Sequence, residues 1–171
     1  NAQGARFPHA DPSTRLAEYP DRALEDIPQG RFPQRIIDEA EEDLETFAAV
    51  LRTAWVTVRR PEVWDHDKTF GTIQWSTPGY YNYCPRDILL VLGELMLATP
   101  NVIRGRWQET FSYRTLLMEY MHSGARWFSA PKPMLLDELF PTEPGQLTPR
   151  DLEPACDAAN HIAADCPAGI S

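Results

Sequence analysis

The stretch CPRDILLVLGELMLATP, residues 84–100, carries the strongest structural signal in the chain. It holds two apolar runs of strand length, DILLVL and LMLAT, around the pair Gly93-Glu94. Two β-prone runs joined by a glycine-containing turn are typical of a hairpin. We therefore expect a β-hairpin with Asp87 at the mouth of its first strand, where burial of an unpaired charge is costly.

The segments around the hairpin alternate between helical and extended patterns. Apolar residues recur at helical spacing over 34–54 and 109–123, while WVTVRR (55–60) and ARWFSAP (125–131) have strand composition. The aromatic-rich segment 61–86 is predicted to be a long ordered loop. The order helix, strand, loop, hairpin, helix, strand predicts an α/β protein built from short repeated units.

Polar or proline-rich segments flank this pattern. Residues 1–33 are predicted to be a loop that wraps a surface, and 131–152 a Pro-rich connection with one short amphipathic turn. The following EPACDAANHIAAD weakly repeats the opening of the hairpin, since Asp157 again follows a cysteine near a proline. We expect residues 1–171 to belong to one domain.

Composition limits the partners and the setting. Of the 171 residues, 43% are hydrophobic and 24% charged, as in ordinary soluble globular proteins. The net charge of −9 argues against a nucleic-acid partner, and the sequence has no apolar run long enough to predict a membrane span. Three cysteines without CxxC spacing suggest free thiols in a reducing, cytoplasmic setting. Because the chain begins with Asn1 rather than Met, we expect processing or truncation.

Metal and cofactor motifs are absent from the sequence. Its four histidines are scattered, without HxxxH or HExxH spacing, and it has no phosphate loop, GxSxG or GxGxxG. We therefore expect neither a metal nor a cofactor. Cys84 and Cys156 are predicted to be buried, inert thiols, because the sequence shows no neighbouring base that would lower the pKa of either.

Asp87 and Asp157 are the candidate site residues, and each has two interpretations. Asp87 could be a structural carboxylate that pairs with Arg86, Arg104 or Arg106, or that caps a turn. It could instead face a cleft and bind a cation. A planar carboxylate matches a guanidinium best, because it accepts two parallel hydrogen bonds. The same alternatives hold for Asp157, and together the two aspartates would form an acidic pocket.

Four long strings of the sequence resemble the arginine-dependent amidinotransferases. They are FPQRIIDEAEEDLETFAAVLR, TPGYYNYCPRDILLVLGE, YRTLLMEYMHSGARWFSAPKPMLLDELF and EPACDAAN, in collinear order between about residues 6 and 162. The bacterial branch that serves antibiotic biosynthesis is more similar than the vertebrate glycine amidinotransferases. The resemblance implies a pentein-type α/β-propeller, in which ββαβ modules surround a central active site, with only the first modules present here.

The resemblance also implies a reaction and its partners. In the family a cysteine thiolate attacks the guanidino carbon of L-arginine, ornithine leaves, and the amidino-cysteine passes its amidino group to a primary amine. The PRD motif falls on Asp87, which would hold the arginine guanidinium. The EP..DAA motif falls on Asp157, which would orient and charge-balance a catalytic histidine.

In the family the nucleophilic cysteine, the histidine and a second guanidinium-binding aspartate lie further along the chain. None of Cys84, Cys156 and Cys166 matches the nucleophile, so these 171 residues alone are predicted to be inactive. The leading hypothesis is part of an amidinotransferase for an aminocyclitol phosphate or an amino acid. Its partner would be the remainder of the enzyme or a second copy. The alternative is a non-catalytic relic that binds a guanidino ligand or a protein.

Overall fold

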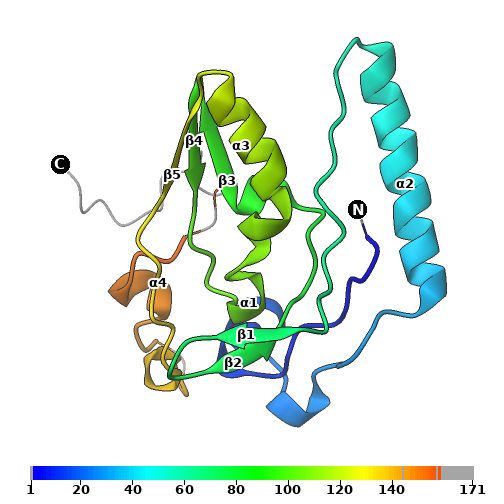
Figure 1. Ribbon diagram of the computed structural model, residues 1–171. Helices are drawn as coiled ribbons and strands as arrows, with labels where there is room; N and C mark the ends of the chain where they lie inside the picture. The colour runs from blue at the N-terminus through cyan, green and yellow to red at the C-terminus, as the bar shows by residue number, and fades with distance from the viewer. Residues whose placement is uncertain (1, 144, 157, 159–171) are drawn as a thin grey trace.

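The computed structural model describes residues 2–143, 145–156 and 158. Figure 1 shows a sheet with one helix packed on it, a small two-stranded sheet at the lower end, and a long helix to one side. Among the described residues, no helix is both long and apolar enough to cross a membrane.

A three-stranded sheet is the centre of the structure. β3 (Leu89–Leu92) pairs antiparallel with β4 (Leu95–Ala98), and β4 pairs in parallel with β5 (Arg126–Ser129). The helix α3 (Arg114–His122) connects the two parallel strands and covers one face of the sheet (Figure 1). In chain order, β3, β4, α3 and β5 form one ββαβ unit.

Two glycines and a small core shape this unit. Gly93 has a φ of 60° in the tight turn between β3 and β4, and Gly124 has a φ of 106° just after α3, conformations that side-chain-bearing residues rarely adopt. Between sheet and helix, one apolar cluster contains Ile88, Met96 and Leu117. Ile88, the residue next to Asp87, is only 1% exposed and is therefore fully buried in this core.

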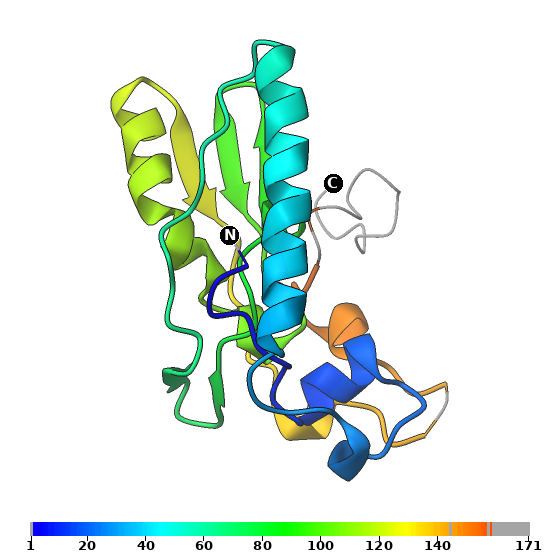
Figure 2. The same ribbon diagram turned by 90° about the vertical axis from the view of Figure 1, so that its right-hand side faces the viewer.

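The lower end of the molecule contains a second core, which has more buried residues than the one between the sheet and α3. β1 (Thr69–Gly71) and β2 (Ser76–Pro78) form an antiparallel pair there, and α1 (Pro12–Glu18) and α4 (Pro149–Leu152) lie below the three-stranded sheet (Figure 2). The buried residues of this core are Trp75, Tyr80, Val102, Ile103, Leu135, Phe140 and Ala155. Two of the single-turn 3-10 helices in the described residues are Leu24–Asp26 and Asp137–Leu139.

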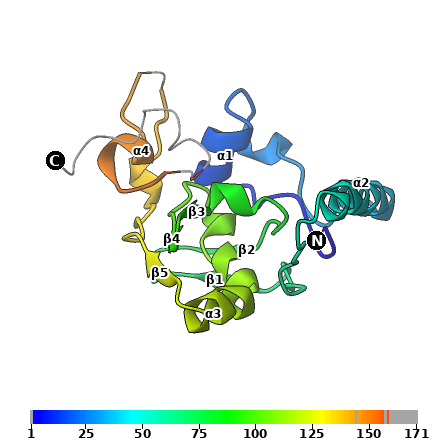
Figure 3. The ribbon, with the colours of Figure 1, turned by 90° about the horizontal axis from the view of Figure 1, so that it is seen from above.

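The helix α2 (Gln34–Thr53) stands beside the sheet rather than on it (Figures 1 and 3). Near its N-terminal end, Ile37 packs with Ala2 and Ala5. Further along, Phe47 is 61% exposed although it belongs to the apolar stripe of the helix. The apolar stripe of α2 is therefore only partly buried, and much of it is exposed.

The predicted helix at 34–54, the hairpin after Asp87 and the strand within 125–131 are confirmed. The α/β class is confirmed as well, and the ββαβ order agrees with the predicted module. The prediction of one helix over 109–123 was too simple, because a 3-10 helix, Glu109–Tyr113, precedes α3. The propeller arrangement of several such modules stays a prediction.

The predicted strand at 55–60 is wrong. No strand of the described residues pairs with this segment, and Trp55 is 96% exposed with a φ of 62°. Strand composition does not make a strand without a neighbouring edge to bond to. The segment 61–86, predicted as a loop, contains β1 and β2, and the segment 1–33 contains α1.

Candidate functional site

Asp87 lies at the start of the three-stranded sheet, as predicted. It ends the single-turn 3-10 helix Pro85–Asp87, two residues before β3 begins. Thr99, just after β4, donates its backbone N–H to Ile88 O at 3.0 Å and its hydroxyl to Asp87 O at 3.2 Å. These bonds tie the two ends of the hairpin together, so the backbone beneath the Asp87 side chain is fixed.

The side chain of Asp87 is paired with arginine. Nη1 of Arg106 donates a hydrogen bond of 2.7 Å to Asp87 Oδ2, and Nε of Arg86 lies 3.5 Å from Oδ1. The carboxylate of Asp87 therefore pairs with two of the three arginines named in its structural interpretation, Arg86 and Arg106. Arg104, the third arginine considered, bonds instead to Leu135 O and to Asp137 Oδ1.

Arg106 is the centre of a buried ionic cluster, which we define as Asp87, Arg106 and Glu109. Nε of Arg106 donates to Glu109 Oε2 at 2.5 Å and Nη2 to Oε1 at 3.1 Å, the two-bond geometry that suits a guanidinium and a carboxylate. Nη2 also donates to Cys84 O at 3.2 Å, and the guanidinium lies 4.8 Å from the centre of the Tyr81 ring. One positive and two negative side chains leave the cluster with a net negative charge.

Burial makes this cluster electrostatically strong. The side chains of Arg106 and Glu109 are each 2% exposed, and that of Asp87 is 14% exposed. Burial alone would lower the pKa of Arg106, but its bonds to Glu109 and Asp87 raise that pKa instead, so the guanidinium stays charged. Burial, followed by the charge of Asp87, raises the pKa of the nearby Cys84 thiol above its ordinary value.

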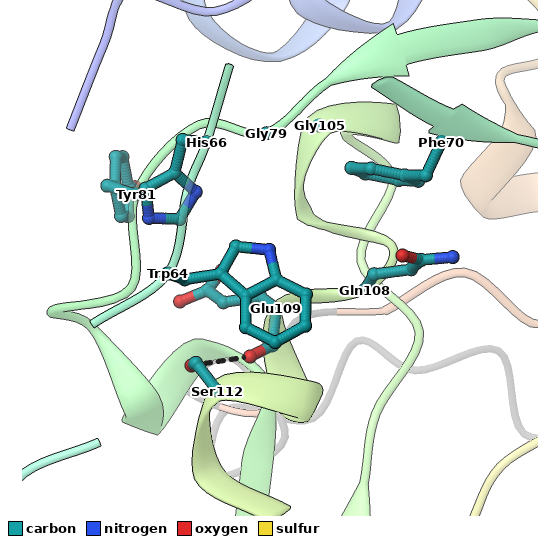
Figure 4. Close-up of a pocket in the computed structure, with 9 residues that line it drawn as sticks. All are labelled: Trp64, His66, Phe70, Gly79, Tyr81, Gly105, Gln108, Glu109 and Ser112. Carbon is teal, nitrogen blue, oxygen red and sulfur yellow. Dashed lines mark hydrogen bonds between the residues drawn. The ribbon is translucent and has the colours of Figure 1, made fainter. Parts of the chain in front are cut away.

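A small cavity lies behind Glu109 (Figure 4). His66 and Tyr81 lie on one side of it and Phe70 and Gln108 on the other. Its volume of about 10 Å³ leaves room for about one water molecule. His66 is 3% exposed, its Nε2 has no hydrogen-bond partner among the described residues, and burial lowers its pKa. Because of its small volume, the cavity cannot hold an amino-acid ligand.

A larger open groove, of about 290 Å³, runs between α2 and the segment 58–61. It borders Pro85, two residues from Asp87, and its remaining lining is mainly apolar. Arg59 and Arg60 contribute its charged groups, each paired with a glutamate elsewhere. Among the described residues the lining contains no carboxylate, and its two arginines disfavour a guanidinium in this groove.

Asp157 lies outside the described residues. The neighbouring Cys156 is described, and its backbone N–H donates to Pro100 O at 2.7 Å, directly after Thr99. Cys84 and Cys156 are both half-buried reduced thiols, which corrects the expectation of full burial. The described residues hold no cluster of three or more His, Cys, Asp or Glu side chains that could bind a metal ion.

The sequence patterns did not predict that Glu109 belongs to the site. An acid three residues after Arg106 is a recognisable spacing for an ion pair within one helical turn. The sequence showed no sign, however, that this turn would be buried beside Asp87. The position of the Arg106 guanidinium between the carboxylates of Asp87 and Glu109 could be recognised only in the folded structure.

Comparisons with known proteins show that the chain is similar to amidinotransferases over about half of their length. No protein-family model matches the chain. It is 44% identical to inosamine-phosphate amidinotransferase 1 of Streptomyces glaucescens, over 93% of this chain and 47% of that protein. It is 45% identical to the L-arginine:L-lysine amidinotransferase of Pseudomonas savastanoi pv. phaseolicola, over 64% of this chain and 30% of that protein.

Solved structures give the same result. The inosamine-phosphate amidinotransferase of Streptomyces griseus matches with a TM-score of 0.87 and 46% identity, covering 94% of this chain and 47% of that one. An amidinotransferase of the saxitoxin pathway from Microseira wollei matches with a TM-score of 0.79 and 32% identity, covering 94% and 49%. The chain thus spans about half the length of these similar proteins.

Proposed function

Because the chain is a homologue of the amidinotransferases over about half of their length, we propose that it is the guanidino-binding part of such an enzyme. Asp87 accepts a hydrogen bond from the guanidinium of L-arginine. The amidino group then passes to a primary amine, an aminocyclitol phosphate or an amino acid. Relatives whose names specify inosamine phosphate and lysine support these acceptor classes.

The state of the Asp87 carboxylate carries this proposal. Arg106 takes Oδ2 from the buried side, whereas in the described part of the chain Oδ1 meets the exposed Arg86 at 3.5 Å. An exposed ion pair at that distance is weak and easily exchanged. A ligand guanidinium can therefore replace Arg86 at Oδ1, and the net negative charge of the buried cluster favours a cation there.

Transfer needs a second set of groups. In the covalent route a thiolate attacks the guanidino carbon, the C–N bond to ornithine breaks, and the leaving amine takes up a proton. Cys84 is the described thiol nearest Asp87 along the chain, and burial and Asp87 raise its pKa, so little thiolate forms. We propose that these 171 residues alone bind the guanidino group without transferring it.

Three further parts of the proposal concern residues and partners beyond this cluster. Asp157 orients and charge-balances a catalytic histidine, on the strength of the EP..DAA motif. The remainder of the enzyme, or a second copy of the chain, completes the active site. The setting is cytoplasmic, in accord with cysteines that form no disulfide among the described residues.

A second function, binding without any catalytic role, is favoured by the same unreactive thiol. Calorimetry of the full chain with L-arginine and an ornithine-release assay separate the possibilities. Asp87→Asn is expected to weaken arginine binding about 10- to 100-fold, since a charged hydrogen bond is lost. Ornithine formed by the chain alone would contradict the proposed lack of transfer. Absence of arginine binding would contradict the guanidino site.

A further inference from the structure

The two oxygens of the Asp87 carboxylate lie in unequal environments. Oδ2 is held at 2.7 Å by Arg106, whose side chain is almost fully buried and has four further acceptor or ring contacts to fix it. Oδ1 faces Arg86, whose side chain is 81% exposed. The carboxylate is therefore locked from the inside, and Oδ1 is the oxygen that a ligand can reach.

Glu109 adds negative charge beside Asp87, where Glu18 also interacts electrostatically with both Asp87 and Arg106. Both of its oxygens bond to Arg106, so the one positive charge of that guanidinium is shared between two carboxylates. Coulomb interactions among such buried groups are weakly screened. Without the charge of Glu109, Asp87 and Arg106 would form a neutral pair, and the attraction for a third, cationic group would fall.

Building on the proposed function, we propose that Arg106 is a positioning residue for Asp87 and that Glu109 is the counter-ion that keeps the site negative. Arg106 turns Oδ2 inward and presents Oδ1 outward. The ligand guanidinium therefore bonds to Oδ1 alone, not to both oxygens as it would on an unpaired carboxylate. Recognition then depends chiefly on charge, so a cationic guanidino group is preferred over a neutral ureido group.

The test compares L-arginine with L-citrulline, its neutral ureido counterpart, by calorimetry on the full 171-residue chain. Glu109→Gln removes one charge but leaves the Arg106–Asp87 bond in place. The affinity for arginine is expected to fall about tenfold while the affinity for citrulline stays unchanged. The ratio of the arginine affinity to the citrulline affinity then falls about tenfold as well. A purely structural role for Glu109 would change both affinities together.

Arg106→Lys tests the positioning step. Lysine keeps the charge but lacks the planar fork, so it cannot hold both carboxylates in the same geometry. Arginine affinity is again expected to fall about tenfold. The matched control is Arg104→Lys, because Arg104 is an equally buried arginine in the same 3-10 helix, Arg104–Arg106, that bonds elsewhere. Its arginine-to-citrulline ratio should stay that of the wild type.

The outcomes distinguish this inference from the proposed function. If Asp87→Asn weakens arginine binding about 10- to 100-fold while Glu109→Gln and Arg106→Lys keep the wild-type affinity and ratio, the inference is overturned and the proposed function stands. If the wild-type chain binds no arginine, the proposed function fails and the inference falls with it. Circular dichroism checks that each variant folds, and if Arg106→Lys does not, Glu109→Gln decides the matter.

Discussion

Arg104 and Arg106 occupy one turn of 3-10 helix and are 3% and 4% exposed, yet they serve two different regions. Arg104 faces the lower core, where it bonds to Leu135 O and to Asp137, a carboxylate that is 73% exposed. Arg106 faces the sheet end and bonds to a fully buried and a nearly buried carboxylate.

The difference teaches that burial of an arginine does not by itself mark a site. The Arg104 region holds a neutral backbone acceptor and a solvated acid, so it is a structural tie between distant segments. The Arg106 region holds two carboxylates away from solvent, and their charges exceed that of the guanidinium. What surrounds the cation, rather than the cation itself, makes one region a structural tie and gives the other the negative charge on which the proposed ligand site depends.

Removal of each guanidinium is expected to change stability most, and by different amounts in the two regions. Arg106→Met leaves Glu109 buried without its counter-charge, and we expect the free energy of unfolding to fall by about 3–5 kcal/mol. Arg104→Met leaves Leu135 O without a donor but returns Asp137 to water, and a loss of about 1–3 kcal/mol is expected. Urea unfolding followed by circular dichroism measures both.

A double variant supplies the control for that prediction. Arg106→Met with Glu109→Met removes the buried acid together with its partner, so part of the lost stability should return. Equal losses in the single and double variants would mean that packing, and not an uncompensated charge, sets the effect.

The dependence of the free energy of unfolding on pH is expected to show an effect of intermediate size in the Arg106 region. His66 lies behind Glu109, and burial lowers its pKa in the folded state. The unfolded chain therefore binds the proton more tightly. The stabilisation is fully present above about pH 6.5 and is lost as the pH falls below that value, by at most about 1.4 kcal/mol per pH unit.

The variant His66→Gln should remove this part of the pH dependence of the free energy of unfolding. His122→Gln is the matched control, because His122 is exposed at the end of α3. An unchanged slope in His66→Gln between about pH 5 and 6.5, the range around the ordinary histidine pKa, would show that His66 is not the group responsible.

The smallest effect is expected at Arg86. Its ion pair with Asp87 spans 3.5 Å at the surface, so Arg86→Gln should change the free energy of unfolding by less than about 1 kcal/mol. Arginine binding should tighten slightly, by about twofold or less, because a competing cation is gone. Marked destabilisation would place Arg86, rather than Arg106, as the main partner of Asp87.

Local patterns predicted the elements that depend on neighbouring residues. The apolar period of α2 and the turn at Gly93 are both encoded within a few residues, and both were predicted correctly. The segment 55–60 has the same kind of strand composition as β5, but β5 has β4 beside it. Strand formation depends on a partner elsewhere in the chain, and composition carries no record of that partner.

The similarity to amidinotransferases, the α/β class, the hairpin and the position of Asp87 at its start could all be predicted from the amino-acid sequence alone. Which arginine pairs with Asp87, and which further charge lies beside that pair, became visible only in the folded chain. Arg104 and Arg106 are two residues apart on a helix with about three residues per turn, so their side chains leave it in different directions. Which of the two side chains reaches the buried carboxylates depends on how the hairpin, α3 and the lower core pack together. That packing brings together residues that are far apart in the sequence.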